Sequence, residues 1–262
     1  MIDIGVNLTN SRFDKDRPQV LERAQAAGVE AILVTGTNVH ESQQALALCQ
    51  QYSPYLYSTA GVHPHDADGV EADYLSQLKN LAQSNYVKAI GECGLDFNRN
   101  FSTPENQLKV FQEQVNLAVE LNMPLFLHQR DAFEPWLKIL QPALTKVPAM
   151  VAHCFTGSKS ELIQCLDAGM YIGITGWLCD ERRGQSLQEI VKYIPLERLM
   201  IETDAPYLTP RTIRPKPKSS RNEPQYINYV VQSLAQLTGH SESDIISATM
   251  QNSRQVFALA NS

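Results

Sequence analysis

The sequence has few cysteines and lacks the spacings that cysteine-dependent sites use. Five cysteines occur in 262 residues, and no two of them form a CxxC pair. An odd number without that pairing argues against a disulfide framework and against a zinc ribbon. Reduced thiols that pack as small apolar residues are typical of a reducing compartment, so we expect a cytoplasmic protein.

Long apolar runs and an excess of basic residues are also missing. No run approaches the roughly 20 apolar residues needed to cross a bilayer, and the N-terminus has no basic, cleavable leader, so we expect no membrane association. Acidic residues (28) outnumber Lys and Arg (22), which gives a net charge of −6. This balance excludes a globally basic nucleic-acid coat, although it allows a local basic patch.

Three common catalytic signatures do not occur. The chain has no GxSxG elbow that would expose a nucleophilic serine, no GxxxxGK[ST] loop that would cradle phosphates, and no GxGxxG dinucleotide fingerprint. The sequence therefore excludes the usual forms of serine hydrolases, P-loop nucleotidases and dinucleotide-binding dehydrogenases.

Short apolar runs alternate with longer helical patterns along the chain. Eight such runs begin 21 to 38 residues apart, a spacing that suits a strand, a crossover helix and two loops. No linker interrupts the alternation, so we predict one (β/α)8 TIM barrel over residues 1–262 rather than an open doubly wound sheet. The runs are residues 2–6, 31–35, 57–61, 87–91, 125–127, 150–152, 171–174 and 199–201.

Helix start and stop signals support this alternation. Thr103 followed by Pro104 predicts the capped start of a helix that ends near Leu121, and Gly169 is suited to end a helix in a left-handed conformation. The predicted helices are residues 17–27, 40–51, 104–121, 158–168, 224–237 and 243–259.

Polar residues that suit metal ligation follow several of the runs. In a parallel barrel these positions lie on the C-terminal rim, where such enzymes place their active sites. Four of the six histidines in the chain occur there, together with two acids. Imidazole and carboxylate groups from separate strands can surround a divalent ion and leave a position open for water. The residues are His63, His65, Glu92, His128, His153 and Asp204.

Two cysteines and a second acid lie beside these residues. Cys93 follows Glu92 and Cys154 follows His153, so in a strand their thiols point to the opposite face, where packing is expected rather than nucleophilic or zinc chemistry. Glu202 shares a strand face with Asp204, and we expect it to support the site from behind or to cap a backbone group.

A basic segment follows the last run. Residues 211–221 carry five positive charges and no acid. Prolines favour an extended loop there, and the position beside the rim favours binding of a phosphate polyanion over a merely solvated loop. The candidate phosphate-binding residues are Arg214, Lys216, Lys218 and Arg221.

Several motifs, taken in order, resemble the TatD family of metal-dependent deoxyribonucleases within the amidohydrolase-like barrels, and most closely its bacterial members. The similarity covers nearly the whole chain. The motifs are GVHPH at 61–65, GECGLD at 91–96, LH at 127–128, HCFTG at 153–157, ETDAPYL at 202–208 and RNEP at 221–224.

The resemblance implies roles for the rim residues. Glu92, His128 and His153 would hold the metal, and Asp204 would be a further ligand or the base that orients the attacking water. His63 and His65 would contact the scissile phosphate or assist the leaving oxygen.

One departure from the family pattern concerns the N-terminus. Many relatives begin with Asp-x-His-x-His, whose histidines help to hold a second ion. Here Gly5 and Asn7 replace both histidines. Glycine has no ligating side chain and a neutral amide is a poor substitute, so we expect one firmly held ion.

The resemblance implies hydrolysis of phosphodiesters, with Mg²⁺ as the usual ion and Mn²⁺ or Zn²⁺ as alternatives. It also implies a 3′–5′ exonuclease on single-stranded DNA, and possibly RNA, with a role in DNA repair; we expect a monomer. Two other functions remain open: a metal-dependent ester or amide hydrolase acting on a small or tRNA-linked substrate, and a nucleic-acid binder without activity. Rim aromatics that can stack on bases are Phe97, Phe101, Phe155, Trp177 and Tyr207.

Overall fold

The computed structural model describes residues 1–260, in which parallel strands alternate with helices. The eight strands follow one another in the sheet in the order of the chain. The last strand returns to the first, because residues Val6 and Ala205 form a parallel bridge. This is the topology of the predicted (β/α)8 barrel. No helix among residues 1–260 is long and apolar enough to span a membrane.

The chain divides into two compact units. The first unit contains Met1–Leu33, Cys154–Leu166 and the chain from Tyr171 onward, and the second contains Val34–His153 and Asp167–Met170. The main elements of the first unit are β1 Ile2–Val6, α1 Arg17–Ala26, β2 Ala31–Val34 (whose last residue begins the second unit), α6 Lys159–Asp167, β7 Tyr171–Ile174, α7 Gln185–Ile190, β8 Leu199–Ile201, α8 Ile227–Thr238 and α9 Glu242–Phe257.

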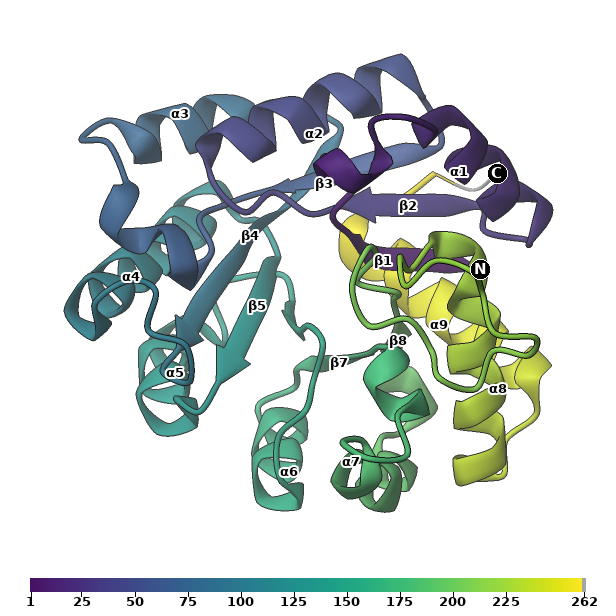
Figure 1. Cartoon of the computed structure of the whole chain (residues 1–262). Coiled ribbons are helices and arrows are strands. Elements are labelled where there is room, and N and C mark those ends of the chain that lie inside the picture. Colours follow the sequence, from purple (N-terminus) through teal and green to yellow (C-terminus); the bar gives the residue numbers. More distant parts are fainter. Residues whose placement is uncertain (261–262) are drawn as a thin grey trace. The chain divides into compact units, whose positions relative to one another are not determined.

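The second unit holds strands β3 to β6, of which β3, β4 and β5 are labelled in Figure 1. Here β3 pairs with β4, β4 with β5, and β5 with β6, all in parallel. The elements are α2 Val39–Gln51, β3 Leu56–Ala60, α3 Tyr74–Leu81, β4 Val87–Asp96, α4 Pro104–Leu121, β5 Leu125–Arg130, α5 Phe133–Leu140 and β6 Met150–Ala152.

The predicted elements agree with the structure at most positions. Four runs match their strands residue for residue: β1, β6, β7 and β8. The Thr103 hydroxyl caps α4 as predicted, and Gly169 has φ +78° after α6. Three helices were not predicted, namely α3, α5 and α7.

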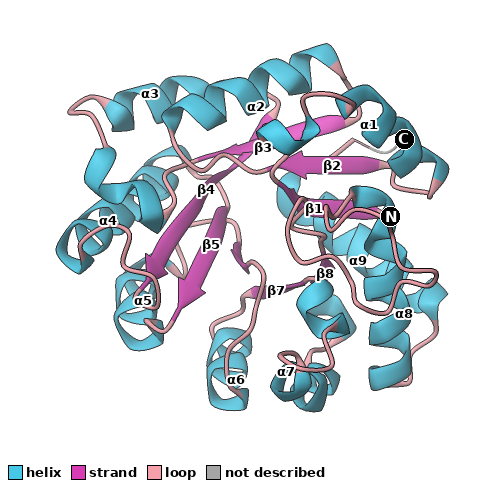
Figure 2. Ribbon diagram, in the orientation of Figure 1, coloured by secondary structure: helices cyan, strands magenta, loops and turns pink. Residues whose placement is uncertain are grey.

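Strands β4 and β5 extend beyond the predicted runs, which places two site residues inside strands rather than after them. Strand β4 continues to Asp96 and β5 to Arg130, and the two long strands lie side by side in Figure 2. The prediction that Glu92 and His128 follow their strands is therefore corrected. The polar side chains ended the apolar pattern, but the backbone pairing continues to Asp96 and Arg130.

Close approach of β4 to β5 depends on two glycines. A Cβ on Gly91 would lie 2.2 Å from the Phe126 carbonyl oxygen, and one on Gly94 would lie 1.8 Å from that of His128. Both residues have positive φ, +142° and +153°, which side chains rarely allow. The register also shifts between Ile90 and Cys93, a bulge that changes where the intervening side chains point. These features place Glu92 beside His128.

Helix α4 fixes the ends of two strands through buried amides. The Gln107 side chain accepts a hydrogen bond from the Asp96 N–H at 2.9 Å and donates one to the Asp96 carbonyl at 3.2 Å. Gln114 does the same with Val62, at 2.7 and 3.0 Å. Each buried amide accepts one hydrogen bond and donates another, which restricts its geometry. Helix α4 therefore holds the backbone next to the site residues rigidly.

Candidate active site

Three histidines of the second unit converge on one carboxylate. The Glu92 Oε1 atom lies 3.0 Å from His128 Nδ1, 3.2 Å from His153 Nε2 and 3.4 Å from His63 Nε2. These residues come from different parts of the chain, and the parallel strands bring them to one place. The structure thus brings together the three residues expected to bind a metal.

The environment of Glu92 keeps it ionised. Burial by itself would raise the pKa of this carboxyl, but the charges and hydrogen bonds of His153, His63 and His128 hold its pKa well below the ordinary value. Glu92 is only 5% exposed. A buried carboxylate surrounded by imidazoles is a strong site for a divalent cation, which would balance its charge.

A second carboxylate, Asp96, lies beside this cluster. Its Oδ2 atom is 2.8 Å from His65 Nε2 and 3.4 Å from His128 Nε2. Burial would raise the pKa of Asp96, but its contacts with the two histidines and the Arg99 N–H lower it. The sequence analysis gave Asp96 no role. Its spacing was a usable signal, because residues 92, 94 and 96 share one face of a strand.

The hydrogen bonds of His63 distinguish it from the other histidines. Its Nδ1 accepts the His65 N–H at 3.1 Å, so a neutral His63 carries its proton on Nε2, which faces Glu92. Burial lowers the pKa of His63 and favours this neutral form. Although His63, Glu92 and His128 are close enough to share an ion, a protonated Nε2 is a donor rather than a ligand.

His128 has the features of a ligand. Its Nδ1 contacts Glu92, whereas its Nε2 is buried and has no hydrogen bond among the described residues. An unbonded buried nitrogen is costly unless another group binds it. The contacts with Asp96 and Glu92 raise the pKa of His128 despite burial, which alone would lower it. The two carboxylates therefore favour a proton on His128 in the free protein, and a metal ion that binds Nε2 must displace that proton.

Asp204 belongs to the first unit, where it follows β8. Its Oδ1 atom accepts a hydrogen bond from Asn7 Nδ2 at 2.9 Å, and its N–H donates to the Gly5 carbonyl at 2.9 Å. The two residues that replace the family's N-terminal histidines therefore hold Asp204 in place. Glu202 is fully buried, and its Oε1 accepts the Cys154 N–H at 2.6 Å, which is the backbone-capping role expected for it.

Another buried acid, Asp3, gives a testable dependence of stability on pH. Burial raises the pKa of Asp3 to about 8, although hydrogen bonds from Thr203 lower it. In the folded protein Asp3 therefore stays protonated up to about pH 8, whereas in the unfolded chain it ionises above about pH 4. Its contribution to the free energy of unfolding is largest below about pH 4 and is lost as the pH rises towards about 8. We expect the free energy of unfolding to fall over this range by up to about 1.4 kcal/mol per pH unit relative to Asp3→Asn.

Urea denaturation of both proteins at a series of pH values, in EDTA, measures this difference. The asparagine is isosteric and cannot titrate, so all other groups cancel in the comparison. Parallel stability curves for the two proteins would show that Asp3 is ionised in the folded state.

Burial keeps several of the thiols protonated. None of the five cysteines forms a disulfide, and Cys93 is fully buried, with a pKa that burial raises. Burial also raises the pKa of Cys49 and of Cys165 to about 12. Such thiols stay protonated and pack as apolar groups, as the sequence suggested.

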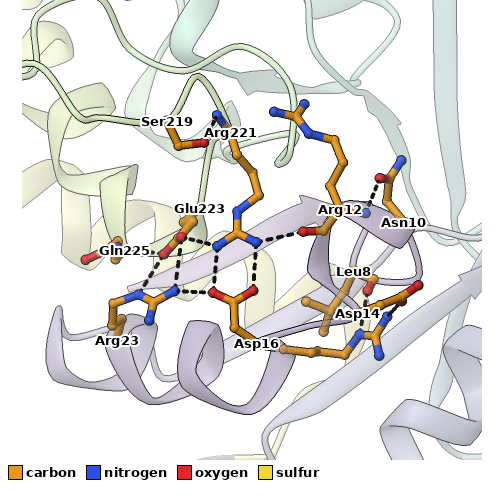
Figure 3. Close-up of polar contacts among 11 residues, drawn as sticks. Leu8, Asn10, Arg12, Asp14, Asp16, Arg23, Ser219, Arg221, Glu223 and Gln225 are labelled. Atoms are coloured by element: carbon orange, nitrogen blue, oxygen red, sulfur yellow. Dashed lines mark hydrogen bonds and ion pairs between the residues drawn. The ribbon is translucent and has the colours of Figure 1, made fainter.

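The residues of the basic segment differ in how they are held. Arg221 donates to Asp16 at 2.7 and 2.8 Å and to Glu223 at 2.7 Å, and Arg23 bonds the same two carboxylates (Figure 3). Arg214 donates to the backbone carbonyls of the loop itself. Lys216 and Lys218 are exposed. The two lysines are thus more available to a phosphate than Arg221, which two carboxylates already neutralise.

Comparisons with known proteins agree with these features. Residues 2–258 match the sequence model of the family described as TatD related DNase. A protein from Pectobacterium carotovorum named 3′-5′ ssDNA/RNA exonuclease TatD is 54% identical, with 99% of this chain and 100% of the relative covered. A protein of the same name from Erwinia amylovora is 53% identical, with 99% and 100% covered.

Solved structures show the same similarity. The crystal structure of a TatD family hydrolase from Entamoeba histolytica superposes with a TM-score of 0.90 at 28% identity, covering 99% of this chain and 98% of that one. The (β/α)8 fold and the histidine–carboxylate cluster are thus accompanied by a family match over nearly the full length. The chain belongs to the TatD family of DNases.

Proposed function

We propose that this TatD-family protein is a metal-dependent 3′–5′ exonuclease that hydrolyses single-stranded DNA and RNA. The single observation that supports this most is the buried Glu92 carboxylate with three histidine nitrogens within 3.4 Å. The polarity and the substrate rest on relatives more than 50% identical that are named 3′-5′ ssDNA/RNA exonucleases.

We propose that Glu92, His128 and His153 hold one divalent ion and that Mg²⁺ is the ion used. When bound, such an ion lowers the pKa of a water ligand and polarises the phosphoryl oxygen. Because imidazole nitrogens suit Zn²⁺ and carboxylate oxygens suit Mn²⁺, the donor set makes these the two alternatives to test. With Gly5 and Asn7 in place of histidines, the proposal is one firmly held ion in the free protein.

The chain's own groups then have distinct tasks. Asp204, oriented by Asn7, is proposed as the base that positions the attacking water or as a further ligand. His63, with its proton on Nε2, would donate to the phosphate or to the leaving oxygen. His65, held by Asp96 at 2.8 Å, lies with its ring centroid 4.2 Å from that of His63 and would assist the same oxygen.

The basic segment is proposed to follow the nucleic-acid backbone through Lys216 and Lys218. Replacing both with Gln is expected to weaken binding of all sequences alike and to reduce the log–log salt slope by about 0.7 per lost contact on a single strand. Turnover at saturating substrate should stay unchanged, because these contacts are the same in the ground and transition states. Fluorescence anisotropy over a salt series measures the slope.

The matched control replaces both lysines with Arg, which keeps the charges. Arg214 is left intact because it bonds the backbone of the loop. Unchanged affinity and salt slope in the Gln variant would show that the lysines are solvated and contact no phosphate.

We also propose a monomer that works in the cytoplasm, where trimming of 3′ ends would serve DNA repair. The lack of a disulfide among the five cysteines supports a reducing compartment. Size-exclusion chromatography with light scattering tests the oligomeric state.

The decisive experiment uses metal-stripped protein and 5′-labelled single-stranded DNA, duplex DNA and RNA, with Mg²⁺, Mn²⁺ or Zn²⁺ added separately. We expect no activity in EDTA and progressive shortening of single strands from the 3′ end once an ion is restored. Parallel assays use a carboxylic ester and a cyclic amide. Hydrolysis of either of these, with no shortening of any nucleic acid, would overturn the proposal.

A further inference from the structure

A cavity of about 630 Å³ opens beside the histidine cluster in the second unit. His65 belongs to both, because its Nε2 contacts Asp96 while the residue lines the cavity wall. The volume lies within the range of about 300–1,000 Å³ that is typical of sites for small molecules, rather than of a channel for a long strand. Helices α2 and α3 bound it, through residues such as His40 and Gln77.

Phe101 lines this cavity and is exposed. Its side chain is 64% exposed, the largest value among the exposed large apolar residues of the described chain. Its ring meets the ring of His65 edge to face, with centroids 4.7 Å apart and planes 81° apart. Phe101 therefore offers an exposed aromatic ring in direct contact with a site histidine.

The loop that carries Phe101 is held firmly. The Ser102 hydroxyl donates to the His65 carbonyl at 2.8 Å and accepts the Asp68 N–H at 3.0 Å. Asp68 in turn accepts the N–H and the hydroxyl of Thr103. Phe101 is therefore presented by an ordered backbone, and a flat partner could stack on it with little loss of conformational entropy.

The charge of the cavity indicates the chemistry of the group that it binds. Asp66, Asp68 and Glu71 line it, and among the described residues no Lys or Arg does. The cation over the Phe101 ring there is Arg99, whose guanidinium carbon lies 5.8 Å from the ring centroid. A phosphate would be repelled there, whereas an uncharged ring with amine donors would find carboxylate and amide acceptors. Apolar walls from Val39, Val62 and Val70 suit the faces of such a ring.

From these observations we infer that the cavity is the subsite for the nucleobase of the 3′-terminal nucleotide, with Phe101 as its stacking platform. The inference rests on the proposed exonuclease function, since the scissile phosphate would lie at the His65 side. The volume suits a single nucleotide, and in cleavage from a 3′ end the nucleotide beyond the scissile phosphate is the last one of the strand. Stacking on an aromatic ring is tolerant of base identity, as an exonuclease requires.

The test measures binding in EDTA, where no strand is cut. The probes are 5′-fluorescein single strands that are identical except for an abasic 3′-terminal or an abasic penultimate nucleotide. We expect the unmodified strand to bind about fivefold to a hundredfold more tightly than the terminally abasic one, the range for one base stacked on an aromatic side chain. The penultimate change should matter much less.

Three variants test whether Phe101 is the stacking platform. Phe101→Leu keeps apolar bulk but removes the aromatic face, so it should bind both end types equally, and Phe101→Trp should restore the difference. Tyr193→Ala, which removes an exposed aromatic of the first unit, is the control and should behave as the wild type. With Mg²⁺, Phe101→Leu should raise KM and leave kcat nearly unchanged.

Equal affinity of the wild type for both ends would overturn the inference. A preference that survives in Phe101→Leu, or one that follows the penultimate base, would do the same. These outcomes can be told apart from a failure of the proposed function. If the wild type shortens no strand with any ion, the exonuclease proposal is contradicted, and the binding measurements in EDTA still test the subsite.

Discussion

Replacing His128 with alanine is expected to remove metal binding and hydrolysis together. His128 contacts Glu92 through Nδ1 at 3.0 Å, and its buried Nε2 lacks a hydrogen bond among the described residues, so both nitrogens belong to the proposed centre. Loss of the ion forfeits about 4 kcal/mol of transition-state stabilisation, a fall in kcat of roughly a thousandfold or more. Calorimetric titration with Mg²⁺ and Mn²⁺ measures binding, and shortening of 5′-labelled DNA measures turnover.

His240→Ala is the matched control, because His240 is exposed and belongs to the first unit, whereas the cluster residues belong to the second. Circular dichroism should show both variants folded. The wild type should bind one ion in the same titration. Two equally tight ions would contradict the single-ion proposal, and full activity of His128→Ala would remove that residue from the site.

Asp204→Asn should give the second largest loss. An amide cannot accept a proton from water, and removal of a positioned general base costs about 10²- to 10⁴-fold in kcat. We expect the ion to stay bound, because the three proposed ligands Glu92, His128 and His153 all lie in the second unit and remain intact in Asp204→Asn. Single-turnover kinetics and metal titration of the same preparation separate the two effects.

Asn7→Ala is the companion variant. It leaves the Asp204 carboxylate but removes the 2.9 Å hydrogen bond that orients it, so kcat should fall by about tenfold to a hundredfold, less than in Asp204→Asn. If Asp204→Asn instead loses metal affinity in proportion to kcat, Asp204 is a ligand of the ion rather than the base.

The alternation of strands and helices could be predicted from sequence because buried parallel strands are apolar on both faces. The apolar pattern did not predict the ends of the strands that bear the site residues. Strand β4 extends to Asp96 and β5 to Arg130, and both extensions contain charged or polar residues that an apolar pattern excludes. Helices α3, α5 and α7 were missed because they are only eight, eight and six residues long, too short for a clear period.

The candidate ligands could be selected from sequence because their residue types are scarce and each stands near the end of a strand. The partners of each group could not. That His63 accepts the His65 N–H on Nδ1, and so keeps its proton on Nε2, depends on the turn after β3. That Asp96 contacts His65 and His128 depends on the register of β4 and β5.

Charge alone was a poor guide to the basic segment. Arg221 looks equivalent to Lys216 and Lys218 in the sequence, yet Asp16, which lies 205 residues earlier, pairs with it through two hydrogen bonds. Arg214 bonds the backbone of its own loop. The availability of a cation depends on neighbours that are distant in sequence.

By itself, the sequence determined the order of the strands and of the longer helices, the absence of a membrane-spanning run, and most of the histidines and acids proposed for a metal site. These features are local, because they depend on periodicity and on scarce residue types near strand ends. Only the tertiary structure decided that Glu92 receives three imidazoles, that His128 Nε2 is left without a hydrogen bond among the described residues, and that Phe101 stands exposed against His65. Such contacts depend on strand register, on a bulge and on packing between segments far apart in the chain, and no local pattern encodes them.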